Sequence, residues 1–277
     1  MDVKLIALDL DGTTLNNNGK LSEETKDALM TAMDNGVNVC IASGRAFDAL
    51  PEEVLEVPGI EYAITSNGAA IYKVKNKELI KAYKLLASSV DLILSMSKKY
   101  KEITFECFIN GTAYAQKDYI ENPLIVGDKV RSVEYIRKTR HPIDNIVEFI
   151  SENKDNLDCM NIILGDFDVR EKIIDEIKSL TSDVYITSAS PVMLEFSYKD
   201  CGKASGLKFL SEYLGIDRDL IAAFGDADND IDMIKFAGAG LAVANANDAL
   251  KKEADYITLS NDEDGVVYAL KNILEII

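Results

Sequence analysis

The stretch ALDLDGTTL, residues 7–15, runs from apolar side chains into two aspartates, Asp9 and Asp11, and then into a glycine and two threonines. Side chains alternate between the two faces of a strand, so a strand over residues 3–10 would point both carboxylates the same way. Two carboxylates about 4 Å apart repel by roughly 1 kcal/mol in water and about 4 kcal/mol at the effective dielectric of a protein. The pair therefore predicts a positive group or a bound cation where this strand ends.

Composition limits the classes of function. Of 277 residues, 47% are hydrophobic, which is enough to bury a core in one large domain or two smaller ones. Lysine and arginine number 30 against 47 acidic residues, and the net charge of -17 argues against non-specific binding to nucleic acid or to an anionic membrane. No apolar run approaches the ~20 residues of a membrane span, and the first residues lack a signal-peptide profile, so we expect a cytoplasmic protein. The four cysteines include no CxxC pair, which argues against a disulfide framework or a zinc site.

The order of predicted elements indicates two kinds of architecture. Strand and helix patterns alternate at both ends of the chain, which is typical of a parallel sheet covered by helices on both faces. The middle instead contains a hairpin signal, Asn110-Gly111 between alternating apolar residues, among further strands and helices. We therefore expect an α/β fold with a Rossmann-like parallel-sheet core over residues 1–83 and 190–277. An α+β domain over residues 84–189 would be inserted into it.

Three predicted core strands end in polar turns that contain glycine, at residues 9–12, 43–45 and 225–230. Ligands of open parallel sheets collect beyond the carboxyl ends of the strands, so these turns should open into one crevice. The first and third turns bring several carboxylates together. Mg²⁺ prefers oxygen ligands and keeps several waters, so the turns predict a magnesium site beside a phosphate-bearing substrate.

Other phosphate chemistries fit the sequence less well. Cys40 and Arg45 resemble the loop of a cysteine phosphatase, but four residues separate them where five are needed, and Cys40 lies in a predicted buried strand. His141 is the only histidine, so the sequence lacks the residues that a histidine phosphatase or a Ser-His-Asp hydrolase needs. Carboxylate chemistry with a metal is the prediction that remains.

Four motifs in order, DLDGT, ASGR, a lone lysine in CGKASG, and GDADND, resemble those of the haloacid dehalogenase-like phosphatases. The SNGA stretch at residues 66–69 and the inserted middle region resemble the Cof-type branch, in which the insertion is an α/β cap that selects the substrate. The resemblance covers nearly the whole chain. It implies hydrolysis of small phosphate monoesters, such as sugar phosphates or phosphorylated cofactors, with Mg²⁺ and through an aspartyl-phosphate.

The same resemblance assigns roles to individual residues. Asp9 would be the nucleophile, and Asp11 the general acid for the leaving alcohol and then the base for water. The residues expected to bind the phosphoryl group are Leu10, Ser43, Gly44, Lys203 and Asn229. The expected metal ligands are Asp9, Asp11 through its backbone carbonyl, and Asp226. The residues expected to support these groups from outside the site, or to contact the substrate, are Asp230, Arg45, Asn67 and Gly68.

Several alternatives stay open at the level of sequence. A sugar phosphomutase or a non-catalytic protein that binds a phosphorylated metabolite could carry the same motifs. Lys199 is a second candidate for the phosphate-binding lysine, and Asn67-Gly68 is equally well a hairpin turn or a substrate contact. The acidic loop with Asp262 and Asp264 is either a solvated helix start or part of the site.

Overall fold

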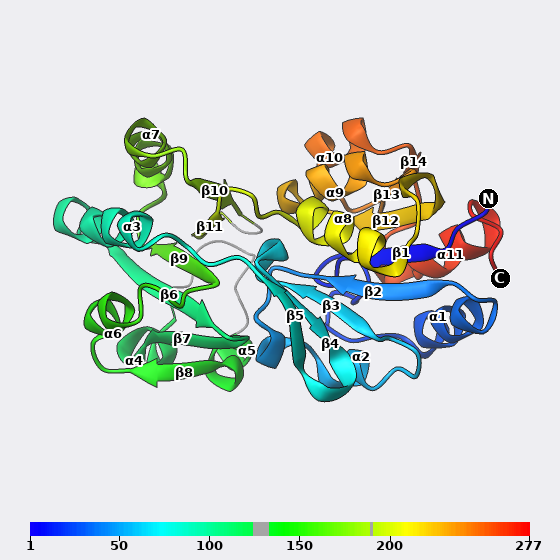
Figure 1. Cartoon of the computed structure of the whole chain (residues 1–277), viewed down its shortest axis with the longest axis horizontal. Helices are drawn as coiled ribbons and strands as arrows, with labels where there is room; N and C mark the ends of the chain where they lie inside the picture. The colour runs from blue at the N-terminus through cyan, green and yellow to red at the C-terminus, as the bar shows by residue number, and fades with distance from the viewer. Residues whose placement is uncertain (124–132, 189–190) are drawn as a thin grey trace. The chain divides into compact units, whose positions relative to one another are not determined.

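The computed structural model describes residues 1–123, 133–188 and 191–277. The chain divides into two compact units (Figure 1). The first unit comprises Met1–Arg45, Leu50–Lys81 and Gly202–Ile277, and the second unit comprises Ala46–Ala49 and Ala82–Cys201. The expected boundary at residue 189 lies outside the described residues. The second unit continues to Cys201 because strand β11 (Met193–Tyr198) pairs with the second unit's sheet.

The first unit is built on a sheet with the strand order β14-β13-β12-β1-β2-β3-β4-β5. Its strands are β1 (Leu5–Leu8), β2 (Asn38–Ala42), β3 (Tyr62–Thr65), β4 (Ala70–Lys73), β5 (Glu78–Ala82), β12 (Ile221–Gly225), β13 (Ala239–Ala242) and β14 (Tyr256–Ile257). Pairing is parallel from β14 through β3 and antiparallel between β3 and β4. The predicted parallel core is therefore confirmed, and the carboxyl ends of β1, β2 and β12 lie at the same edge.

Helices cover this sheet and help to place its polar turns. The helices of the first unit are α1 (Glu23–Asp34), α2 (Glu52–Leu55), α8 (Lys203–Leu214), α9 (Ile231–Phe236), α10 (Asp248–Glu253) and α11 (Gly265–Asn272). Leu5 and Ala7 of β1 belong to one buried cluster with residues of α8, α9 and α10. By alternation along β1, Asp9 points to the same face as Leu5 and Ala7, which is the face covered by α8. This geometry directs Asp9 toward the start of α8.

The second unit has its own sheet, in the order β10-β11-β9-β6-β7-β8. Its other strands are β6 (Ile103–Ile109), β7 (Thr112–Gln116), β8 (Arg140–Ile143), β9 (Cys159–Leu164) and β10 (Val184–Thr187), and its helices are α3 (Ala87–Lys99), α4 (Lys117–Glu121), α5 (Val133–Thr139), α6 (Ile146–Glu152) and α7 (Arg170–Leu180). The pairing is antiparallel except between β7 and β8. Asn110 and Gly111 form the predicted hairpin turn between β6 and β7, both with positive φ.

Over the described ranges of the chain, no helix is both long and apolar enough to cross a membrane.

Candidate active site

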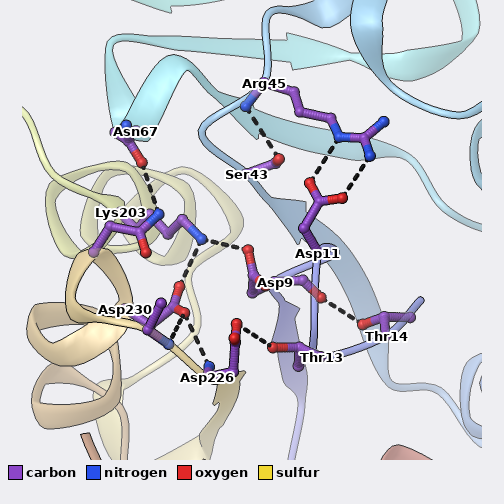
Figure 2. A network of polar contacts seen from close by, with 12 residues as sticks. Asp9, Asp11, Thr13, Thr14, Ser43, Arg45, Asn67, Lys203, Asp226 and Asp230 are labelled. Atoms are coloured by element: carbon purple, nitrogen blue, oxygen red, sulfur yellow. Dashed lines mark hydrogen bonds and ion pairs between the residues drawn. The ribbon is translucent and has the colours of Figure 1, made fainter. Parts of the chain in front are cut away.

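Carboxylates meet at the ends of two neighbouring strands of the first unit. Asp9 follows β1 and Asp226 follows β12, and the Asp9 N–H donates to the carbonyl of Phe224 across these parallel strands at 3.1 Å. One carboxylate oxygen each from Asp9, Asp226 and Asp230 lies within 4.8 Å of the others (Figure 2). The structure thus brings together three of the carboxylates that the sequence singled out.

Lys203 is the positive group beside this cluster. It begins α8, and its Nζ donates to Asp9 Oδ1 at 2.5 Å and to Asp230 Oδ1 at 2.6 Å. The side chain is fully buried, and burial lowers the pKa of Lys203, but Asp230 and Asp9 raise it more, so the net pKa is raised and the amine stays charged. Lys199, the alternative, pairs with Asp183 in the second unit at 3.0 Å.

The two carboxylate oxygens of Asp9 differ in their contacts. Oδ1 accepts from Lys203, whereas Oδ2 is buried and receives a hydrogen bond from none of the residues that the structure describes. Burial raises the pKa of Asp9 well above its usual value, the nearby carboxylates raise it further, and Lys203 lowers it. Burial, followed by the charge of Asp230, raises the pKa of Asp226 to about 6. The raised pKa values mean that burial disfavours the charged forms of Asp9 and Asp226. Together with Asp9 Oδ2, these carboxylates form a set of oxygen donors that fits a hard divalent cation such as Mg²⁺.

Asp230 connects Lys203 to the loop that carries Asp226. Its Oδ1 accepts from Lys203, and its Oδ2 accepts from the backbone N–H groups of Asp226 and Ala227 at 3.0 and 3.1 Å. A Cβ atom on Gly225 would lie 2.5 Å from the Cβ of Asp230, so glycine is needed there. Both oxygens of Asp230 are therefore occupied in positioning the lysine and the loop that carries Asp226.

The Asp11 side chain lies apart from the three clustered carboxylates. It accepts from Arg45 Nε at 2.7 Å and from Arg45 Nη2 at 2.5 Å, and Figure 2 shows it turned toward the guanidinium while Asp9 points toward Lys203. The backbone N–H of Arg45 in turn donates to Ser43 Oγ at 3.1 Å. Gly44 lies between these two residues, in the turn that follows β2. Arg45 thus fixes where the Asp11 carboxylate lies.

Three backbone N–H groups and one hydroxyl shape the turn after Asp9. The N–H groups of Thr13, Thr14 and Leu15 all donate to the carbonyl of Leu10. Thr14 Oγ1 donates to the carbonyl of Asp9 at 2.5 Å. The Leu10 side chain is fully buried, which leaves only its backbone N–H for the phosphate-binding role expected of it.

Gly12 and Thr13 bring this turn against Asp226. Thr13 Oγ1 donates to Asp226 Oδ1 at 3.2 Å, and Gly12 has a φ of +85°. A Cβ atom on Gly12 would lie 2.6 Å from Asp226 Oδ2, so a side chain at this position would displace the carboxylate. Neither threonine was predicted as a site residue, although hydroxyls just after a pair of aspartates are a signal that could have indicated them.

The SNG turn between β3 and β4 is tied to the start of α8. Ser66, Asn67 and Gly68 all have positive φ, and a Cβ on Gly68 would lie 2.0 Å from the carbonyl oxygen of Gly202. The carbonyl of Asn67 accepts from the Gly202 N–H at 2.9 Å, and its Oδ1 accepts from Asn229 Nδ2 at 3.1 Å. Asn67 and Gly68 therefore form the hairpin turn and also contact the residue before Lys203.

The acidic loop that contains Asp262 and Asp264 is hydrogen-bonded to the loop before α1 and to the start of that helix. Asp262 accepts from the backbone N–H of Asn17 at 2.8 Å and from its Nδ2. Asp264 accepts from the hydroxyls of Ser22 and Thr25, at the start of α1. The hydrogen bonds of both aspartates therefore go to the loop before α1 and to the first turn of that helix.

Cys40 lies in the interior of β2 and is fully buried. Burial raises the pKa of its thiol to about 12, so almost no thiolate is present at neutral pH. This environment opposes the cysteine-phosphatase alternative.

Comparisons with known proteins agree with the four motifs. A family model described as haloacid dehalogenase-like hydrolase matches residues 6–270. The chain is 29% identical to the 5-amino-6-(5-phospho-D-ribitylamino)uracil phosphatase YcsE of Bacillus subtilis, over 98% of this chain and 96% of that protein. It is 31% identical to the phosphatase YwpJ of the same organism, over 98% of this chain and all of that protein. The solved structure of a haloacid dehalogenase-like hydrolase from B. subtilis matches with a TM-score of 0.83 at 27% identity, over 98% of this chain and 100% of that one. The chain therefore belongs to the haloacid dehalogenase-like hydrolases, in the Cof-type branch of phosphatases that its motifs resemble.

Proposed function

We propose that the chain hydrolyses small phosphate monoesters with Mg²⁺, through an aspartyl-phosphate formed on Asp9. The observation that carries this proposal is the state of the Asp9 carboxylate, which is buried, bonded to Lys203 at one oxygen and, among the described residues, without a hydrogen-bond partner at the other. The relative YcsE is named for a phosphorylated ribitylaminouracil, which supports a small phosphorylated metabolite as the substrate class. Sugar phosphates and phosphorylated cofactors are the candidates.

The metal would be held by Asp9 Oδ2, by Asp226 and by the backbone carbonyl of Asp11. When bound there, Mg²⁺ would neutralise negative charge on the oxygens of the transferring phosphoryl group. Asp230 would remain on Lys203 and on the backbone of the Asp226 loop, where both of its oxygens already have donors.

The chemical steps are proposed for side chains of the first unit. Asp9 attacks phosphorus, the bond to the leaving oxygen breaks, and Asp11, in its protonated form and with one oxygen released from Arg45, gives that oxygen a proton. Water then attacks phosphorus of the aspartyl-phosphate, Asp11 takes the proton from the water, and phosphate leaves as Asp9 is restored. The groups that would bind the phosphoryl oxygens are the Ser43 hydroxyl, the N–H groups of Leu10 and Gly44, Lys203 and Asn229.

We also propose that the inserted second unit selects the leaving group.

We propose, in addition, that the protein works in the cytoplasm. The four cysteines, Cys40, Cys107, Cys159 and Cys201, are free and buried, which supports a reducing compartment.

The proposal is tested by measuring phosphate release from a panel of sugar, nucleotide and cofactor phosphates, with Mg²⁺ and with EDTA. Release that requires the metal would establish the phosphatase and rank its substrates. Transfer to a second hydroxyl without free phosphate would instead indicate a phosphomutase. No turnover by the folded, Mg²⁺-loaded protein on any compound would contradict the proposal.

Replacing Asp11 with asparagine should slow hydrolysis of alkyl phosphates by about 10²–10⁴-fold, because the amide cannot donate or accept the proton. The first step should suffer less with p-nitrophenyl phosphate, whose leaving group needs no proton, so the aspartyl-phosphate should accumulate. Rapid-quench labelling measures this species. Asp27→Asn, an exposed position on α1, is the matched control. A near-full rate in Asp11→Asn would remove its assigned role.

Replacing Asp226 with asparagine should raise the Mg²⁺ concentration for half-maximal activity by about tenfold or more, because one charged oxygen ligand is lost. A metal titration of phosphate release measures the change. The Thr13 hydroxyl can still donate to the amide oxygen, so the loop should keep its place. An unchanged titration would show that Asp226 is not a ligand.

Cys40→Ala should keep the wild-type rate of phosphate release, and iodoacetamide at neutral pH should leave Cys40 unmodified. The reason is that the thiol is buried and its pKa is raised to about 12. Mass spectrometry of the native protein and a steady-state assay check both outcomes. Loss of activity in a variant of wild-type thermal stability would restore the cysteine chemistry.

A further inference from the structure

A short segment after β13 reaches both loops of the proposed metal site. Asn245 Nδ2 donates to the carbonyl of Gly12 at 2.7 Å, in the loop that follows Asp9. Two residues later, the backbone N–H of Asn247 donates to the carbonyl of Asp226 at 2.9 Å. One stretch of chain therefore holds a backbone carbonyl of each of the two loops that carry the clustered carboxylates.

The Asn245 side chain is itself held in one orientation. Its Oδ1 accepts from the backbone N–H of Asn261 at 2.9 Å, so the amide cannot turn over without losing both bonds. Asn261 Nδ2 in turn donates to the carbonyl of Leu15 at 2.9 Å, further along the loop that contains Gly12. The loop is thus anchored at two points by asparagines that lie more than 200 residues away in the sequence.

Gly12 also lies next to the carboxylate of Asp226. A Cβ atom on Gly12 would lie only 2.6 Å from Asp226 Oδ2, and the hydroxyl of the neighbouring Thr13 donates to the same carboxylate. A shift of the Gly12 carbonyl would therefore move the backbone beside Asp226 and the neighbouring Thr13, whose hydroxyl donates to Asp226. It would also change the separation between Asp226 and Asp9.

We propose that Asn245 is a positioning residue for the metal: oriented by Asn261, it fixes Gly12 against Asp226 and so sets the affinity of the site for a divalent cation. This inference rests on the proposed function, because it takes Asp9 and Asp226 as the ligands. The Asn245 side chain is exposed and lies outside the buried core, so its hydrogen bond contributes little to folding stability. Its effect should therefore fall on metal binding.

The test compares Asn245→Ala with wild type by calorimetric titration of Mg²⁺ into the metal-free full chain. We expect the Kd for Mg²⁺ to rise about tenfold, the range seen when groups behind a metal ligand are removed. The melting temperature of the metal-free variant should fall by no more than about 2 °C. At saturating Mg²⁺ the rate of phosphate release should return toward wild type, which separates lost affinity from lost chemistry.

Asn272→Ala is the matched control, because its side chain also makes an exposed bond to a backbone carbonyl, that of Tyr268 in α11. It should leave the Kd for Mg²⁺ unchanged. An Asn245→Ala protein with wild-type affinity would overturn the inference while leaving the proposed function intact. A wild-type protein that binds no Mg²⁺ would overturn the metal part of the proposed function, and this inference with it.

Discussion

Asp9→Asn should lower phosphate release by about 10⁴-fold or more and should leave no covalent phosphoryl group on the protein. An amide cannot attack phosphorus, whereas its oxygen can still accept the hydrogen bond that Lys203 Nζ gives to Asp9 Oδ1. The loss should therefore come from chemistry and not from unfolding. Rapid-quench labelling with a radioactive substrate, together with a steady-state assay, measures both quantities.

The Asp11→Asn protein provides the internal comparison for this experiment. It retains Asp9, the proposed nucleophile, so it should carry label from p-nitrophenyl phosphate under conditions in which Asp9→Asn carries none. Label on a folded Asp9→Asn protein, or a rate close to wild type, would place the nucleophile elsewhere. Thermal unfolding of each variant checks that the fold is retained.

The second large effect is expected at Lys203. Lys203→Met should lower activity by about 10³-fold, because the charge opposite the phosphoryl oxygens is lost. It should also cost the metal-free protein about 3–5 kcal/mol of stability, since Asp9 and Asp230 would remain buried without their shared cation. Urea unfolding measures the stability, and added Mg²⁺ should recover part of it by supplying charge beside Asp9.

If Lys203→Met does not fold, its activity cannot be measured, and a second variant is then used. Lys203→Met combined with Asp230→Asn removes one of the two stranded carboxylates, so it should be more stable than Lys203→Met alone. Its activity should stay at the low level of the single variant. A single variant as stable as wild type would show that Lys203 does not balance the buried charges.

Much of the fold was predictable because it follows from local patterns. Alternating apolar strands and helices indicated the parallel core, and the rule that ligands collect at the carboxyl ends of strands brought Asp9 and Asp226 to one edge. Asn110-Gly111 predicted its hairpin from two residues alone. The end of the inserted region was harder, because the apolar pattern of β11 suits a core strand as well as a strand of the second sheet.

The contacts of the site depend on tertiary structure in a way that no local pattern records. The orientation of the Asp11 carboxylate is set by Arg45, and neither position indicates the pairing from its own neighbours. Asn245 and Asn261 are ordinary loop residues in the sequence, yet both reach the loop after Asp9. Asp262 and Asp264 could not be assigned from the sequence because an acidic helix start and a metal loop have the same composition.

The places where the chain passes between the two units bear on how such an enzyme can be recombined. Arg45 is the last residue of the first unit before Ala46–Ala49, and Lys203 is the second residue after the second unit ends at Cys201. Arg45, which contacts Asp11, and Lys203, which contacts Asp9, therefore each lie within two residues of a boundary between the units. A chimera that takes its second unit from a relative should therefore be joined after Lys81 and after Cys201, so that Arg45 and Lys203 stay with the aspartates of this chain that they contact.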